Sequence, residues 1–179
     1  MQVIAGKYKG QVLKTPKGMA TRPTIGKVKK SLFDICLHEL EGCHFLDLFA
    51  GSGQMGIEAL SRGGASACFV EKGKEAVSCI HSNLKKLNLS DCTDVYPISV
   101  ERAINKLNDH CFDIIYIDPP YGGDLKFLKL LDHSSIFHPK TRIFLEERLS
   151  CKPMSLDHLV YVDERKYGDT VLFELRQRI

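Results

Sequence analysis

The residues of this sequence that most directly indicate chemistry are Asp118-Pro119-Pro120-Tyr121. Proline lacks an N–H and has a fixed φ, and a residue before proline is held extended, so this segment should form a stiff edge of acceptors. Such an edge suits an –NH2 group on a planar ring, with one hydrogen bonded to the Asp118 carboxylate and the other to the Pro119 carbonyl. Tyr121 offers an aromatic face on which an extruded base can stack. We expect these residues to activate an amino group by positioning and electrostatics; a simple turn is the alternative.

A second candidate site is the glycine-rich segment 51–56, Gly-Ser-Gly-Gln-Met-Gly. Glycines in a Gly-x-Gly-x-x-Gly pattern let the backbone turn tightly and approach a ligand closely. Glu71 follows Gly51 by 71 − 51 = 20 residues, the spacing at which dinucleotide-type folds bind a ribose diol. Asp47 precedes the turn, and its negative charge favours the cationic amino-acid end of S-adenosylmethionine (SAM) over a pyrophosphate. Alternatively, Asp47 caps the loop and Glu71 is a surface acid.

Both candidate sites must be positioned by the elements that precede them. After Gly42 the apolar pattern alternates between short strands and helices, which predicts a mostly parallel sheet covered on both faces. The last two strands flank Gly168-Asp169 and predict an antiparallel hairpin. The expected strands are His44–Phe49, Ala67–Glu71, Asp94–Ile98, Phe112–Asp118, Arg142–Glu146, Leu159–Tyr167 and Thr170–Arg176, and the expected helices are Gln54–Arg62, Lys74–Leu87, Val100–Leu107 and Leu125–His133.

We expect residues 1–41 to form a basic extension that docks RNA, and residues 42–179 to form the catalytic domain. Residues 2–14 alternate weakly around two glycines and predict a short hairpin with lysines on one face. A loop containing two prolines follows. From Gly26 a helix is expected, with Lys27, Lys29 and Lys30 exposed near its start and an apolar face that contains Val28, Leu32, Ile35, Cys36 and Leu40.

The charge of the chain is concentrated at its beginning. Residues 1–30 contain eight lysines and arginines and no acid, a charge of +8, so the remaining residues sum to 3 − 8 = −5. A basic segment on a mildly acidic body favours a polyanionic partner, because lysines displace counterions from phosphates. A solvated lysine-rich tail remains the alternative.

Other bulk features narrow the class of protein. No apolar run approaches the roughly 18 residues of a membrane span, and the N-terminus lacks an apolar signal core, so a cytoplasmic protein with no membrane partner is expected. None of the seven cysteines lies in a Cys-x-x-Cys pair. Cys36, Cys68 and Cys79 lie in apolar stretches and should be buried thiols. The seven scattered histidines show no metal spacing, so no metal is expected.

With these residues in view, a family resemblance is visible. The Asp47–Gly53 segment together with Asp118–Tyr121 resembles class I SAM-dependent amino-methyltransferases. The rest of the chain is similar to the bacterial 16S rRNA guanine-N2 methyltransferase family of RsmD type, through the motifs Ile4-x-Gly6-x-x-Lys9-Gly10, Arg22-Pro23-Thr24, Val28-Lys29-x-x-Leu32-Phe33 and Tyr167-Gly168-Asp169-Thr170.

The resemblance implies a Rossmann-like fold with a seven-stranded sheet. We expect the enzyme to be a monomer. It implies SAM as methyl donor, with S-adenosylhomocysteine as product. The implied target is the N2 amino group of one guanine in 16S rRNA, within an assembled or partly assembled small ribosomal subunit.

The resemblance also assigns residues. It places Asp47, Gly51 and Gly53 at the methionine end of SAM, Glu71 at the ribose and Ser99-Val100 at the adenine edge. The full expected sets are Asp118, Pro119, Pro120 and Tyr121 for catalysis; Asp47, Phe49, Gly51, Ser52, Gly53, Glu71, Lys72, Ser99 and Val100 for the cofactor; and Lys7, Lys9, Arg22, Thr24, Lys27, Lys29 and Lys30 for RNA.

The sequence departs from the family pattern in several places. Ser99-Val100 stands where Asn/Asp-Ala is frequent, Lys30 where glutamate is usual, and Gly26 where a polar residue is usual. Lysines replace arginines at three basic positions, which keeps the charge but loses bidentate phosphate recognition.

Four other functions compete with this interpretation. A DNA adenine-N6 methyltransferase shares the acceptor chemistry but normally needs a target-recognition domain, for which 179 residues leave no room. A protein glutamine methyltransferase favours Asn at the position of Asp118 and would not explain the basic segment. An NAD-linked reductase would leave Asp118–Tyr121 unexplained, as would an RNA-binding module without catalysis.

Overall fold

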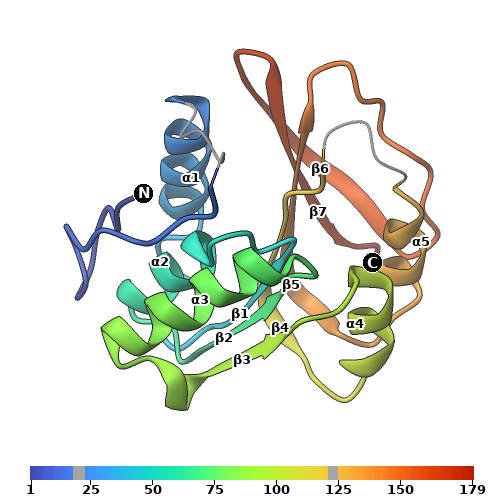
Figure 1. The fold of residues 1–179 in the computed structure, drawn as a ribbon. Helices are drawn as coiled ribbons and strands as arrows, with labels where there is room; N and C mark the ends of the chain where they lie inside the picture. Colours follow the sequence, from blue (N-terminus) through green and yellow to red (C-terminus); the bar gives the residue numbers. More distant parts are fainter. Residues whose placement is uncertain (18–22, 121–124) are drawn as a thin grey trace.

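The computed structural model describes residues 1–17, 23–120 and 125–179. Its centre is a seven-stranded sheet with the order β3-β2-β1-β4-β5-β7-β6 (Figure 1). Six strands run in one direction and β7 runs against them, so the predicted mostly parallel sheet with a terminal antiparallel hairpin is confirmed. The strands are β1 (His44–Leu48), β2 (Ser66–Val70), β3 (Thr93–Tyr96), β4 (Phe112–Ile117), β5 (Phe137–Arg148), β6 (Leu159–Tyr167) and β7 (Thr170–Gln177).

Helices cover both faces of the sheet. On one face lie α1 (Pro23–Ile35), α2 (Gln54–Ser61) and α3 (Lys74–Leu87), and on the other α4 (Val100–Lys106) and α5 (Lys126–Asp132), with a 3₁₀ turn at Ser90–Cys92 (Figure 1). Strand β4 shows why two layers are needed, because Ile114 and Tyr116 enter one apolar core while Ile115 and Ile117 enter the other. Within the described residues, no helix combines the length and the apolar character needed to cross a membrane.

Helix α1 ends earlier than its apolar pattern predicts. The expected face extended to Leu40, but the helix stops at Ile35. Arg142 Nη1 donates to the Ile35 carbonyl at 2.8 Å, and the same guanidinium bonds both carboxylate oxygens of Glu174 at 2.8 and 3.0 Å. This arginine satisfies an orphan carbonyl at the end of the helix. Leu40 is still buried, in the turn that follows.

Strand β5 is longer than the predicted Arg142–Glu146. It begins at Phe137, and its pairing with β4 shifts register between Phe112 and Ile114. The added residues include the polar stretch His138-Pro139-Lys140, which hides the strand from an apolar pattern. Proline is tolerated at such irregularities because no ladder hydrogen bond is required of it there.

The predicted hairpin over residues 2–14 is present only in part. A single bridge joins Gln2 to Val12, and the two arms exchange bonds from the Val3 amide to the Gln11 carbonyl (3.0 Å) and from the Gly10 amide to the Val3 carbonyl (2.9 Å). Val3 and Leu13 are buried in the same core as α1 and α2. The beginning of the chain is therefore packed onto the body.

Gly6 explains how closely this segment docks on α2. Its φ is +78°, and a Cβ at this position would lie 1.7 Å from the Ser61 carbonyl oxygen. The Lys7 amide donates to that carbonyl at 2.7 Å, and the Tyr8 amide donates to the Ser61 hydroxyl at 2.9 Å. Packing therefore explains why the N-terminal motif has a glycine at position 6, since no side chain would fit between this segment and α2.

Lys29 corrects the expectation of three exposed lysines. It is 1% exposed, and its Nζ lies 2.7 Å from Glu58 Oε2. Burial lowers the pKa of Lys29, and Glu58 opposes this shift. For Glu58, burial alone would raise the pKa, but the charge of Lys29 and hydrogen bonds from the Ile4 amide, Lys29 and Arg62 lower it overall. This pair lies inside the protein, so Lys29 is not available to RNA.

We predict that Lys29→Met will lower the free energy of unfolding by about 3 kcal/mol, because it leaves the Glu58 carboxylate buried without its cation. The matched control is Lys30→Met, an exposed neighbour on the same helix, for which a change within about 0.5 kcal/mol is expected. Urea unfolding followed by circular dichroism measures both. Equal midpoints for the two variants would contradict the structural role of the ion pair.

Candidate functional site

The carboxyl ends of β1 and β4 meet at one edge of the sheet and open into a pocket of about 360 Å³. Its wall combines the glycine turn after β1, the end of β2, the start of α4 and the segment after β4. Nine of the predicted catalytic and cofactor residues line it: Phe49, Gly51, Glu71, Lys72, Ser99, Val100, Asp118, Pro119 and Pro120. Residues from four distant parts of the sequence therefore converge on one cavity, as expected at the switch point of an open α/β sheet.

The turn after β1 has the tight geometry that its glycines predict. Gly51 and Gly53 have φ of 56° and 77°, and the non-glycine Phe49 has φ of 64°. A left-handed aromatic residue is unusual and marks a backbone held by its surroundings. The third glycine of the pattern, Gly56, serves packing, because a Cβ there would lie 2.5 Å from Phe69 Cε1.

Glu71 ties the pocket wall together from the end of β2. Its Oε2 accepts the Gly51 amide at 2.9 Å, and its Oε1 accepts the Gly73 amide at 2.7 Å. The carboxylate is thereby fixed beside the glycine turn while it lines the cavity. Each carboxylate oxygen has a second lone pair, so Glu71 can still accept a ribose hydroxyl.

Asp47 lies behind the turn and is not among the residues that line the pocket. It is 1% exposed, and its Oδ2 accepts the Gly56 amide at 3.1 Å. Burial raises the pKa of Asp47 well above its usual range, the Gly56 amide opposes the shift, and the charge of Glu71 adds to it. This hydrogen bond joins the β1 side chain to the first turn of α2. Ser52 is also buried, and a Cβ added at Gly53 would lie 3.2 Å from Phe69 Cε1 and 3.3 Å from Ile80 Cγ1.

The segment after β4 forms the opposite wall. The Asp118 amide donates to the Leu48 carbonyl at 3.3 Å, which joins the end of β4 to β1. Asp118 is partly exposed, Pro119 is buried and Pro120 is exposed, and all three line the pocket. Tyr121, the fourth predicted residue, lies outside the described residues.

A buried pair lies behind this wall. The Tyr116 hydroxyl donates to Glu146 Oε2 at 2.5 Å. Burial raises the pKa of Tyr116 well above its usual range, and the nearby carboxylates of Asp118 and Glu146 raise it further. The pair was not expected from the sequence, because both residues fall within apolar strands and only the pairing of β4 with β5 brings them together.

The start of α4 contributes the last part of the pocket. Ser99 is the residue before the helix, yet its side chain makes no capping hydrogen bond. Val70, Ile98 and Glu101 also line the cavity and were not predicted. Val70, at the end of β2, and Ile98, just after β3, look like core residues in a sequence, so only their position beside Glu71 and Ser99 would have identified them.

Comparisons with known proteins agree with this geometry. A family model described as "Conserved hypothetical protein 95" matches residues 1–176. "Putative rRNA methyltransferase YlbH" of Bacillus subtilis is 39% identical over 175 residues, 95% of each chain. "Ribosomal RNA small subunit methyltransferase D" of Buchnera aphidicola is 30% identical over 147 residues, 81% of this chain and 76% of that one. The solved structure "Putative methyltransferase yhhF" from Escherichia coli matches in fold, with a TM-score of 0.86 at 24% identity, over 99% of this chain and 98% of that one.

This chain belongs to that family, the RsmD-type class I SAM-dependent methyltransferases. The resemblance inferred from motifs is thereby confirmed, and so is the Rossmann-like class of fold. The match covers the N-terminal segment as well as the sheet, so residues 1–41 are part of the family's pattern.

The residues expected to bind RNA are not all equivalent in the structure. Lys7, Lys9, Lys27 and Lys30 are exposed, whereas Lys29 is buried against Glu58. Arg22 lies outside the described residues, and the side chain of Thr24 is not described. The surface therefore offers fewer cations to a partner than the sequence count suggests.

The glycine turn yields a stability prediction. Gly56→Ala should lower the free energy of unfolding by about 1–3 kcal/mol, because its Cβ would overlap the Phe69 ring and separate α2 from β2. The control is Gly26→Ala in α1, where no atom lies within 4 Å of the added Cβ. That variant should be more stable by roughly 0.5–1 kcal/mol. A stabilised or unchanged Gly56→Ala protein in urea unfolding would refute the packing role.

Proposed function

We propose that this protein transfers a methyl group from SAM to the N2 amino group of a guanine in 16S rRNA, of the guanine-966 type. One observation carries the proposal: the Asp118-Pro119-Pro120 edge lines the same pocket as Glu71 and the glycine turn. The proposed acceptor edge for an amino group and the proposed site for a nucleoside would thus share one cavity. The names of the relatives, which are rRNA methyltransferases, support the choice of RNA as substrate.

The residues of the pocket fit SAM. Glu71 would accept the ribose hydroxyls, while Ser99 and Val100 would face the adenine edge, since the Ser99 hydroxyl is not engaged in capping. Phe49 and Lys72 line the same cavity. Gly51, Ser52 and Gly53 would hold the methionine end. Asp47, which does not line the pocket, would act on the ammonium group only from behind the glycine turn. When bound, SAM supplies an electrophilic methyl group on a sulfonium.

The chain's own part in the chemistry lies in the edge after β4. The Asp118 carboxylate and the Pro119 carbonyl would each accept one hydrogen of the guanine amino group. This draws the nitrogen lone pair out of conjugation with the ring, so the nitrogen becomes a better nucleophile. The prolines keep the edge stiff, and Tyr121 would stack on the extruded base. Positioning and fixed electrostatics carry most of the acceleration.

The proposed substrate is the rRNA within an assembled or partly assembled small subunit. The exposed lysines of residues 1–41, Lys7, Lys9, Lys27 and Lys30, would contact its phosphates, with Arg22 and Thr24 beside them in the sequence. We propose that this segment is the RNA-docking part and residues 42–179 the catalytic part of a monomeric, cytoplasmic enzyme.

We predict that Glu71→Ala will weaken SAM binding at least tenfold. The variant loses the acceptor for the ribose and also frees the Gly51 and Gly73 amides, and hydrogen bonds to a charged group contribute about 1.5–3 kcal/mol each. Isothermal titration with SAM measures the effect. Glu75→Ala, an exposed acid in the first turn of α3, is the control and should bind as the wild type does. Equal affinities for the two variants would place SAM elsewhere.

We predict that Asp118→Ala will bind SAM normally and lose about 10²–10³-fold in methyl transfer, because it removes one acceptor of the amino group and leaves Glu71 in place. Labelled SAM and small subunits from cells that lack the enzyme supply the assay, and mapping the labelled base identifies the target. Asp113→Ala, a carboxylate at the other end of β4, is the control. Wild-type turnover in Asp118→Ala would eliminate the proposed mechanism.

A further inference from the structure

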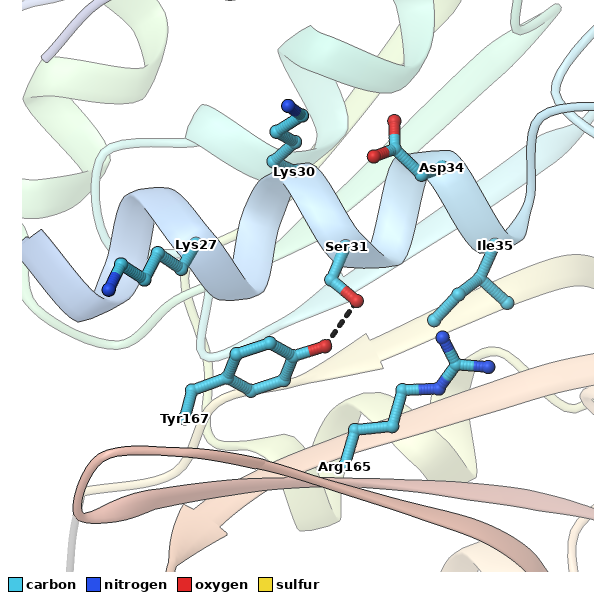
Figure 2. Close-up of a pocket in the computed structure, with 7 residues that line it drawn as sticks. All are labelled: Lys27, Lys30, Ser31, Asp34, Ile35, Arg165 and Tyr167. Carbon is cyan, nitrogen blue, oxygen red and sulfur yellow. Dashed lines mark hydrogen bonds between the residues drawn. The ribbon is translucent and has the colours of Figure 1, made fainter.

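A second and larger hollow of about 590 Å³ lies between α1 and the β6–β7 hairpin. Lys27, Lys30, Ser31, Asp34 and Ile35 line it from the helix, and Arg165 and Tyr167 line it from β6 (Figure 2). The Tyr167 hydroxyl is hydrogen-bonded to the Ser31 hydroxyl, which ties the end of β6 to the middle of α1. We call this hollow the helix–hairpin groove.

The lining of the groove is basic. Its lining includes three cations, Lys27, Lys30 and Arg165, and one carboxylate, Asp34. Arg165 uses its Nε to hold Asp163 at 2.7 Å, and Figure 2 shows the rest of its guanidinium reaching across the groove toward Ile35. Lys27 and Lys30 extend outward from the helix in the same view. A guanidinium and two ammonium groups around one hollow suit phosphate oxygens.

The groove also lies at the edge of the sheet where β4 ends and the pocket opens. Strand β6 runs in the same direction as β4, because β7 is antiparallel to both β5 and β6. Tyr167, the last residue of β6, is therefore at the same edge as Asp118. In the strand order β4-β5-β7-β6 the two strands are three spacings apart, about 14 Å. A single RNA strand can bridge that distance with a few nucleotides.

We propose that the helix–hairpin groove binds the phosphate backbone of the RNA strand that flanks the target base. Lys27, Lys30 and Arg165 contact phosphates, and the Tyr167 ring forms part of the wall beneath them. The inference rests on the proposed function for its substrate. It adds a partner site to which the end of the chain contributes as much as the basic beginning does.

The test measures binding of a single-stranded oligouridylate by fluorescence anisotropy across a salt titration, without SAM. The variant Lys27→Gln/Lys30→Gln/Arg165→Gln should flatten the dependence of log K on log salt by about 2, since each phosphate contact on a single strand contributes about 0.7. Arg165→Gln alone should flatten it by about 0.7, which isolates the hairpin side from the helix. A control of equal charge is Lys85→Gln/Lys129→Gln/Lys140→Gln, three exposed lysines on α3, α5 and the start of β5, and it should keep the wild-type slope.

Three outcomes would contradict the proposed RNA binding in the groove. They are no measurable oligouridylate binding by the wild type, a wild-type salt slope in the groove variant, or an equal flattening of the slope in the control variant. Circular dichroism confirms that each variant is folded. Methyl transfer to small subunits is assayed separately, and it tests the proposed function alone, because the oligouridylate contains no target guanine. If the wild-type protein methylates subunits but the groove variant keeps the wild-type salt slope, the proposed function stands and the proposed RNA contact in the groove is refuted.

Discussion

The buried carboxylate of Glu58 is the interaction on which the arrangement of the N-terminal half depends. It accepts the Ile4 and Ala5 amides at 2.8 and 2.9 Å, pairs with Lys29 at 2.7 Å and with Arg62 at 2.9 Å. One side chain on α2 thus fixes the beginning of the chain and α1 together. Because its pKa is lowered in the folded chain, Glu58 stabilises the fold at neutral pH and loses that contribution as the pH falls through its folded pKa. The glycine turn that lines the pocket leads directly into this same helix, α2.

Most of the sheet was predictable from the sequence because its strands are short, apolar and separated by clear helices. Two predictions failed where a distant contact accompanies a departure from the local pattern. Helix α1 ends at Ile35, where Arg142, more than a hundred residues later, satisfies the Ile35 carbonyl. Lys29 lies on the apolar side of α1 because Glu58 is there to receive it. Neither partner is visible in a window of neighbouring residues.

The residues around the pocket also separate into those that a local motif predicts and those that depend on distant contacts. Asp118, Glu71 and Gly51 line one pocket, as expected from motif chemistry and from the strand ends that bring them to one edge of the sheet. The Tyr116–Glu146 pair was not found, since it depends on the register between β4 and β5. Asp47 shows a further difference: it precedes the glycine turn as the sequence indicates, but its buried carboxylate accepts the Gly56 amide of α2. A sequence can identify which carboxylates gather near a ligand, whereas their burial decides which of them can touch it.

The distribution of charge acquires a different meaning once the fold is known. An acid-free beginning suggests a uniform basic arm, yet Gly6, Val3 and Leu13 dock this segment on α2, and Lys29 is neutralised inside. The cations that remain on α1 lie beside Arg165, which the sequence places far from them and next to acids. Because β6 returns parallel to β4, that arginine comes to the edge where the pocket opens. The basic surface therefore follows from the topology of the hairpin as well as from the count of lysines, and it puts the proposed backbone contacts and the proposed amino-group site at the same edge of the sheet.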